Sequence, residues 1–149
     1  MTKMELAMQR AKRCADRMFA SDQASRELGI EISVAAPGRV SASMTVRASM
    51  LNGFAICHGG YIFTLADTAF AFACNAYDAL TVAAGASIEF LCPAREGDRL
   101  RADADELSRS GRSGIYDVVV RNQDDTRIAV FRGRAHATGK RLLEGKSDT

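Results

Sequence analysis

The stretch from His58 to Ala76 constrains the fold of this chain more than any other segment. Its side chains are apolar or small at nearly every position, so a helix built from them has almost no polar face. A helix that is apolar all round must be buried all round. It would be about five turns long, too short and too rich in small residues to span a membrane. The sequence therefore predicts a central helix around which the rest of the chain is wrapped.

An amphipathic helix is expected at the beginning of the chain, over residues 3–28. Apolar residues recur there at three- and four-residue spacing, with Lys, Arg, Asp and Gln between them. Two short strands should follow over residues 30–35 and 39–46. The turn pair Pro37-Gly38 lies between them and predicts a hairpin.

Four further strands are expected after the buried helix. They span residues 81–91, 99–107, 115–121 and 127–138, and turn-forming clusters separate them, among them a glycine-rich loop over residues 110–114. On the last strand, small and apolar residues alternate with polar ones, so the apolar set should face the helix. The apolar set is Ala129, Phe131, Gly133, Ala135 and Ala137, and the polar set is Arg132, Arg134 and His136.

A run of strands around one buried helix predicts an α+β fold, in which an antiparallel sheet wraps around a long central helix. The 149 residues should form one domain, with residues 1–28 as an N-terminal helical extension and residues 140–149 as a polar tail that frays. The sheet cannot cover every side of such a helix alone. We therefore expect a homo-oligomer.

The composition argues against several classes of protein. The chain has 20 Lys and Arg against 18 Asp and Glu, a net charge of +2 that does not suit non-specific binding of nucleic acid. It contains no signal-peptide pattern and no membrane-spanning run. The four cysteines form no CxxC pair and lie near no histidine cluster. They are typical of reduced thiols in a cytoplasmic protein, and neither a metal nor another cofactor is expected.

One carboxylate, Asp67, interrupts the apolar helix, and no cation lies within four residues on either side. An isolated buried carboxylate is unfavourable, so it needs either a partner or a function. In the structural interpretation, Asp67 pairs with a distant arginine or bonds to the backbone. In the functional interpretation, it lies in a cleft as a general base or a nucleophile.

The helix begins with His58-Gly59-Gly60, which leaves backbone N–H groups uncovered at the positive end of the helix dipole. Such a helix start can bind an anion or polarise a carbonyl, although it can also be a simple tight turn capped by His58. Asp67 follows Gly59 by eight residues, which is about 12 Å along the helix axis. That is too far for both groups to act on one carbonyl. If they cooperate, Asp67 must come from a second copy of the chain.

The block from Asn52 to Asn75, with its His-Gly-Gly and an Asp nine residues after the His, resembles the hotdog-fold acyl-CoA thioesterases, in particular the phenylacetic-acid-degradation (PaaI-type) family. The likeness extends over residues 20–139. It implies a hotdog fold, dimers with continuous sheets and often homotetramers. It also implies hydrolysis of an acyl-CoA thioester of the phenylacetyl-CoA or hydroxyphenylacetyl-CoA type.

The resemblance implies roles for individual residues as well. Asn52 and the Gly59 N–H polarise the thioester carbonyl, with His58 beside them. Asp67 of the facing subunit is the general base or the nucleophile, with Thr68 next to it. Some relatives add a Ser or Thr on the strand after the helix, but residues 82–86 contain neither.

The substrate-binding residues expected from the sequence fall into two groups. Arg112, Ser113 and Gly114 offer a guanidinium and a flexible backbone to the phosphates of CoA, unless this segment is only a solvated hairpin. Gly60 belongs to the helix start, and aromatic side chains such as Tyr61 and Phe63, with Phe54 and Phe70, can line an acyl pocket. The alternative function is a non-catalytic acyl-CoA-binding sensor, which predicts a fused regulatory module.

Overall fold

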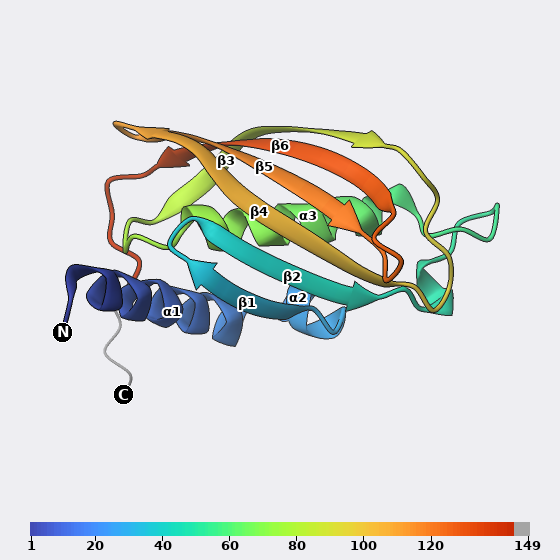
Figure 1. Ribbon diagram of the computed structural model, residues 1–149, viewed down its shortest axis with the longest axis horizontal. Coiled ribbons are helices and arrows are strands. Elements are labelled where there is room, and N and C mark those ends of the chain that lie inside the picture. The colour runs from blue at the N-terminus through green and yellow to red at the C-terminus, as the bar shows by residue number, and fades with distance from the viewer. Residues whose placement is uncertain (145–149) are drawn as a thin grey trace.

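The computed structural model describes residues 1–144 and shows a curved antiparallel sheet around one long helix (Figure 1). The sheet has six strands in the order β1-β2-β4-β5-β6-β3. The helices are α1 (Lys3–Ser21), α2 (Gln23–Glu27) and α3 (Gly59–Cys74), with a short 3-10 turn η1 (Ala48–Met50). The strands are β1 (Glu31–Ala36), β2 (Arg39–Thr45), β3 (Thr81–Phe90), β4 (Arg99–Ser110), β5 (Ser113–Arg121) and β6 (Arg127–Ala137). The predicted α+β fold is confirmed.

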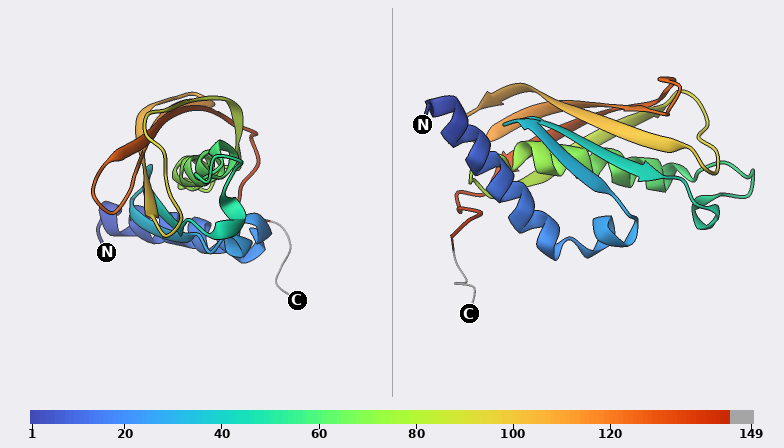
Figure 2. Two further views of the ribbon diagram at one scale, coloured as in Figure 1. Left: turned by 90° about the vertical axis from the view of Figure 1, so that its right-hand side faces the viewer. Right: turned by 60° about the horizontal axis from the view of Figure 1, so that its bottom comes forward.

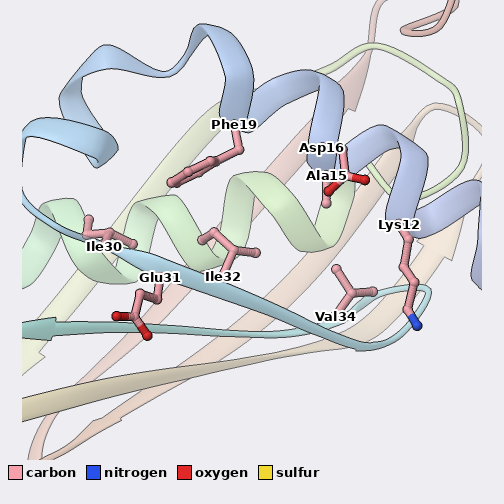
Figure 3. Close-up of a pocket in the computed structure, with 8 residues that line it drawn as sticks. All are labelled: Lys12, Ala15, Asp16, Phe19, Ile30, Glu31, Ile32 and Val34. Carbon is pink, nitrogen blue, oxygen red and sulfur yellow. The ribbon is translucent and has the colours of Figure 1, made fainter.

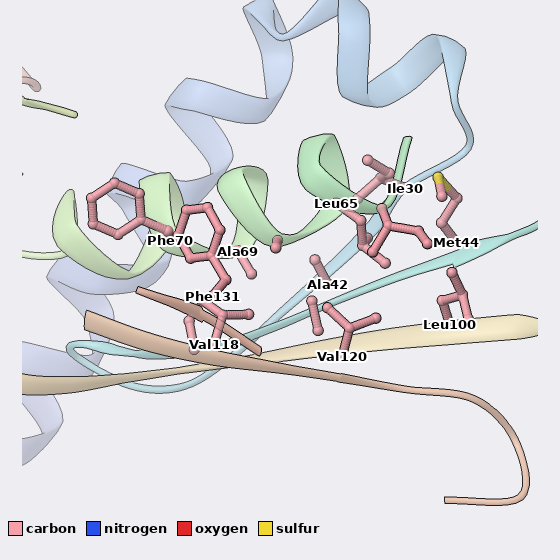
Figure 4. Close-up of a cluster of buried hydrophobic side chains, with 14 of the residues drawn as sticks. Ile30, Ala42, Met44, Leu65, Ala69, Phe70, Leu100, Val118, Val120 and Phe131 are labelled. Carbon is pink, nitrogen blue, oxygen red and sulfur yellow. The ribbon is translucent and has the colours of Figure 1, made fainter. Parts of the chain in front are cut away.

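Helix α3 is the predicted central helix. The end-on view shows the sheet curling around it, with α1 outside the curl (Figure 2). Leu65, Ala69 and Phe70 on its inner face are at most 1% exposed, and they pack against inward residues of the sheet such as Val118 and Phe131 (Figure 4). The alternation predicted for β6 holds, because its apolar side chains turn inward while Arg132, Arg134 and His136 are exposed.

One face of α3 remains uncovered in a single chain, as expected if the sheet cannot cover every side of the helix alone. Gly60, Phe63, Thr64, Asp67 and Ala71 recur at helical spacing and are all partly or fully exposed. We call these residues the open stripe. The sheet leaves them bare because it curves around only part of the helix.

Strand β3 is the second uncovered apolar element. It lies at one edge of the sheet and pairs only with β6. Val82 is 48% exposed and Phe90 is 52% exposed, although both are large apolar side chains. An unpaired apolar edge of this length is a ready template for pairing with another strand.

The N-terminal segment forms two helices where one was predicted. Asp22 ends α1 and caps α2, since its Oδ1 accepts a hydrogen bond from the Ser25 N–H at 2.9 Å. Helix α1 lies against edge strand β1, and a cavity of about 450 Å³ separates the two (Figure 3). Its lining includes Lys12, Phe19 and Ile32. No helix among residues 1–144 is long and apolar enough to cross a membrane.

Two further predictions need correction. The loop expected over residues 110–114 is a two-residue turn, Gly111-Arg112, because Ser110 and Ser113 already pair across β4 and β5. The tail does not fray over residues 140–144, where Arg141 and the backbone of Leu143 bond to Asp78. The rest of that predicted tail, residues 145–149, lies outside the described residues.

Candidate active site

The first turn of α3 leaves one backbone donor open. His58 is the N-cap, and its Nδ1 accepts the Gly60 N–H at 3.0 Å while its carbonyl accepts the Tyr61 N–H at 3.0 Å. The Gly60 N–H predicted to face a substrate is therefore already used. The Gly59 N–H has no acceptor within the described part of the chain. It is a free donor at the positive end of the helix dipole.

The ring of Phe90, at the end of β3, lies directly against Gly59. A Cβ at Gly59 would stand 2.9 Å from Cζ of Phe90, closer than such atoms approach. A larger residue at position 59 would have to displace this ring, so the contact favours glycine. No sequence pattern singles out Phe90, because its position against Gly59 depends on how β3 returns across the helix start.

Asn52 lies in a protruding loop just before α3. Its Oδ1 accepts hydrogen bonds from the backbone N–H groups of Phe54 at 2.9 Å and Ile56 at 3.4 Å. Leu51 and Cys57 close the loop as an isolated β-bridge. The carbonyl side of the Asn52 amide thus holds the loop, and its Nδ2 is the side that can donate to a ligand. Phe54, at the tip, is 85% exposed and lines no pocket with Asp67.

Asp67 is partly buried on the open stripe and has no hydrogen-bond or ion-pair partner among the described residues. Within residues 1–144 of one chain, Asp67 therefore makes none of the pairings with an arginine or the backbone that the structural interpretation requires. Burial raises the pKa of its carboxyl group above the ordinary value, because the charged form loses hydration. A carboxylate without a partner and with a raised pKa is typical of a general base.

A cavity of about 320 Å³ begins at Asp67 and follows α3 toward its C-terminal end. Apolar side chains make up most of its lining. They come from α3, from the start of β3, from α1 and from the tail: Phe70, Ala71, Leu80, Val82, Ala83, Met18 and Leu142. Of the aromatic residues named from the sequence, only Phe70 lines it.

The structure does not bring Thr68 into this cavity. Thr68 is buried on another face of α3, and its Oγ1 lies 3.4 Å from the Ser25 Oγ of α2. Tyr61 lies beside His58, with their ring centroids 6.4 Å apart. Phe63 packs edge-on against Phe131 at 5.4 Å. These contacts favour structural roles for Thr68 and Phe63.

Arg112, Ser113 and Gly114 lie at the opposite end of α3 from Gly59. Their hairpin borders Cys74 and Thr81 in a small cavity at the end of the helix, and the Arg112 guanidinium lies beside Gly139. Since α3 has 16 residues, its ends are about 24 Å apart. One chain therefore does not place this hairpin next to its own Gly59.

Among residues 1–144, no group of three or more His, Cys, Asp or Glu side chains could hold a metal ion. The four cysteines are free thiols. Burial raises the pKa of Cys74 to about 12, so this thiol is neutral at physiological pH and serves as an apolar filler.

Residues 54–129 match the family model described as Thioesterase superfamily. The acyl-coenzyme A thioesterase PaaI of Escherichia coli strain K12 is 42% identical over 125 residues, which cover 84% of this chain and 89% of the relative. The structure of the E. coli PaaI protein from the phenylacetic acid degradation operon has a TM-score of 0.89 and 40% identity, covering 91% of this chain and 98% of that chain.

Two less similar solved structures contain a CoA compound. A Streptococcus mutans UA159 protein bound to acetyl CoA has a TM-score of 0.72 and 28% identity, covering 75% of this chain and 90% of that one. A hypothetical thioesterase of Streptococcus pneumoniae TIGR4 with coenzyme A has a TM-score of 0.71 and 26% identity, with coverages of 75% and 90%.

Proposed function

This chain belongs to the thioesterase superfamily, has its hotdog fold and is a hydrolase of acyl-CoA thioesters; on that premise, we propose that Asp67 is its general base or nucleophile and that the Gly59 N–H binds the oxyanion. The unpartnered, half-buried Asp67 carboxylate at the mouth of an apolar cavity carries this proposal.

Thioester hydrolysis builds negative charge on the carbonyl oxygen, and a positioned donor stabilises that charge by roughly 3–4 kcal/mol. The Gly59 N–H supplies such a donor, since it has no other acceptor among the described residues. Nδ2 of Asn52 is a second donor in the loop that precedes the helix. Phe90 excludes water from the side of Gly59 on which its ring lies.

The site requires at least a homodimer. Gly59 and Asp67 are eight residues apart on one straight helix, which separates them by about 12 Å. One chain leaves both the open stripe and the edge strand β3 uncovered, and a second copy can cover both. In that assembly Asp67 of one copy faces Gly59 of the other. A homotetramer is proposed from the family resemblance.

The acyl group occupies the cavity beside Asp67, whose apolar lining suits aromatic and aliphatic groups alike. Phenylacetyl-CoA and its ring-hydroxylated forms are the proposed substrates, because the E. coli relative comes from a phenylacetic acid degradation operon. Arg112, Ser113 and Gly114 remain the proposed contacts of the CoA phosphates. Arg112→Ala should then raise KM for an acyl-CoA but not for the matching acyl-pantetheine, which lacks those phosphates.

The decisive test measures thiol release from phenylacetyl-CoA, hydroxyphenylacetyl-CoAs and aliphatic acyl-CoAs. Asp67→Ala should lower kcat by about 10²–10⁴-fold, while Asp124→Ala, an exposed aspartate on the β5–β6 turn, should leave it unchanged. Asp67→Asn should still bind acyl-CoA. Tight binding by a wild-type protein that releases no thiol would instead support the acyl-CoA-binding sensor.

A mixing experiment tests whether the site is shared between copies. Asp67→Ala, and Gly59→Pro combined with Phe90→Ala to make room for the proline ring, should each be inactive alone. Co-expressed, they should regain up to about a quarter of wild-type activity, because random pairing makes half of the dimers mixed and each mixed dimer has one intact site. No recovery in isolated mixed dimers would mean that both groups act within one chain.

A further inference from the structure

Two residues that line the cavity beside Asp67 come from outside the sheet and the central helix. Met18 comes from α1 and Leu142 from the C-terminal tail. Resting on the proposed function, we propose that Leu142, held by an Asp78 clamp, forms the end wall of the acyl cavity and sets the length of acyl group that the enzyme accepts.

The placement of Leu142 at the far end follows from the backbone around it. Asp78 comes four residues after the last residue of α3, and Leu80 directly precedes β3. The Leu80 N–H donates to the Lys140 carbonyl at 2.8 Å, and the Leu80 carbonyl accepts the Thr138 N–H at 2.9 Å. The tail therefore runs beside residues 78–80, beyond the C-terminal end of the helix and away from Asp67 (Figure 1).

Asp78 fixes the tail on both sides of Leu142. Its Oδ2 accepts hydrogen bonds from Nε and Nη2 of Arg141 at 2.8 and 2.6 Å, and its Oδ1 accepts the Leu143 N–H at 2.7 Å. Because the residue before Leu142 and the residue after it are both anchored, Leu142 has little freedom to move out of the cavity.

The Asp78 carboxylate suits this role. The Asp78 side chain is only 9% exposed while that of Arg141 is 58% exposed, so the ion pair is shielded from water on the Asp78 side alone. Burial alone would raise the pKa of Asp78, but the Leu143 N–H and the Arg141 guanidinium hold it below its ordinary value. The clamp is therefore charged, and closed, throughout the neutral range.

An apolar end wall discriminates by size. An acyl chain that fills the cavity up to Leu142 gains burial with each methylene, and a longer chain must displace a tethered side chain. In apolar pockets, one methylene changes kcat/KM by about 10–200-fold. Removing the branched end of Leu142 should therefore move the preference toward longer chains.

The experiment compares kcat/KM over a series from butyryl- to dodecanoyl-CoA for the wild type, Leu142→Ala and Leu142→Trp. Leu143→Ala is the matched control, since it makes the same change one residue away and keeps the backbone bond to Asp78. We expect the ratio of long-chain to short-chain kcat/KM to rise about tenfold or more in Leu142→Ala. It should fall in Leu142→Trp and stay unchanged in the control.

Asp78→Asn tests the clamp separately. Asparagine tolerates the left-handed backbone at this position, where φ is 55°, but it weakens the hold on Arg141. We expect a smaller shift toward long chains. Unchanged length profiles in both Leu142 variants, with hydrolysis still dependent on Asp67, would overturn this inference alone. Absence of Asp67-dependent hydrolysis at every chain length would overturn it together with the proposed function.

Discussion

At its first turn, α3 leaves the Gly59 N–H without an acceptor among the described residues, whereas at its last turn the Asn75 side chain satisfies three backbone groups. Nδ2 of Asn75 donates to the carbonyls of Ala71 and Thr81, and its Oδ1 accepts the Thr81 N–H. Asn75 is 3% exposed. One end of the helix therefore has an open backbone donor, and the other end is closed by side-chain hydrogen bonds.

Of the two ends of α3, the open end should show the larger effect on kcat when its donor is removed. Proline at Gly59 deletes the N–H, is accepted at the first position of a helix, and suits the preceding His58, whose φ of −59° and ψ of 132° are typical before proline. In a Phe90→Ala background, which makes room for the ring, Gly59→Pro should lower kcat by about 10²–10³-fold relative to Gly59→Ala. Thermal unfolding should change little between the two proteins. Equal kcat values would remove Gly59 from the oxyanion site.

At the closed C-terminal end of α3, a substitution should lower the stability of the protein more than it lowers kcat. Asn75→Ala leaves the backbone N–H and carbonyl of Thr81 without their Asn75 partner in a partly buried position, which should lower the free energy of unfolding by about 1–3 kcal/mol. Its effect on kcat should be smaller than that of Gly59→Pro. Denaturant unfolding and steady-state kinetics on the same preparation give both values. A variant as stable as the wild type would mean that this end is not closed by Asn75.

The contact between Gly59 and Phe90 predicts a rescue. Gly59→Ala keeps the N–H but places a Cβ 2.9 Å from the Phe90 ring, so it should lower kcat/KM roughly tenfold by displacing the helix start. Adding Phe90→Ala should recover part of the loss. If the double variant is no better than the product of the two single effects, the contact does not determine the requirement for glycine.

The smallest of these effects is the dependence of kcat/KM and of stability on pH, which comes from Asp67 between the two ends of α3. Because burial raises its pKa, kcat/KM should rise with pH through a midpoint above the ordinary aspartate value and then level off. Above that pKa the buried charge opposes folding, and below it the protonated group does not. Asp67→Asn should therefore unfold at a higher temperature than the wild type at neutral pH. The difference should shrink as the pH falls through the Asp67 pKa.

Much of this fold could be predicted because its signals are local. The apolar run of α3 and the alternation along β6 specify their elements and inner faces. The failures involve contacts between distant segments. A helical pattern over residues 3–28 does not show that Asp22 caps a second helix, and the polar sequence after residue 139 does not show that Asp78 binds Arg141.

The candidate site divides in the same way. The free Gly59 N–H follows from a helix start, and the isolation of Asp67 follows from its apolar neighbours, so both were within reach of the sequence. The positions of Phe90 and Leu142 could not be predicted from the sequence. They reach the site only because β3 and the tail return across the two ends of α3.

The exposed edge of β3 also has consequences for how the protein is made in the cell. A newly synthesised chain presents Val82 and Phe90 on an unpaired strand, which is the kind of segment through which immature chains aggregate. If a second copy covers that strand, assembly completes the site and ends this exposure in one step. Substitutions that weaken the pairing should then reduce the yield of native protein as well as turnover, and chaperones should be needed most before the copies meet.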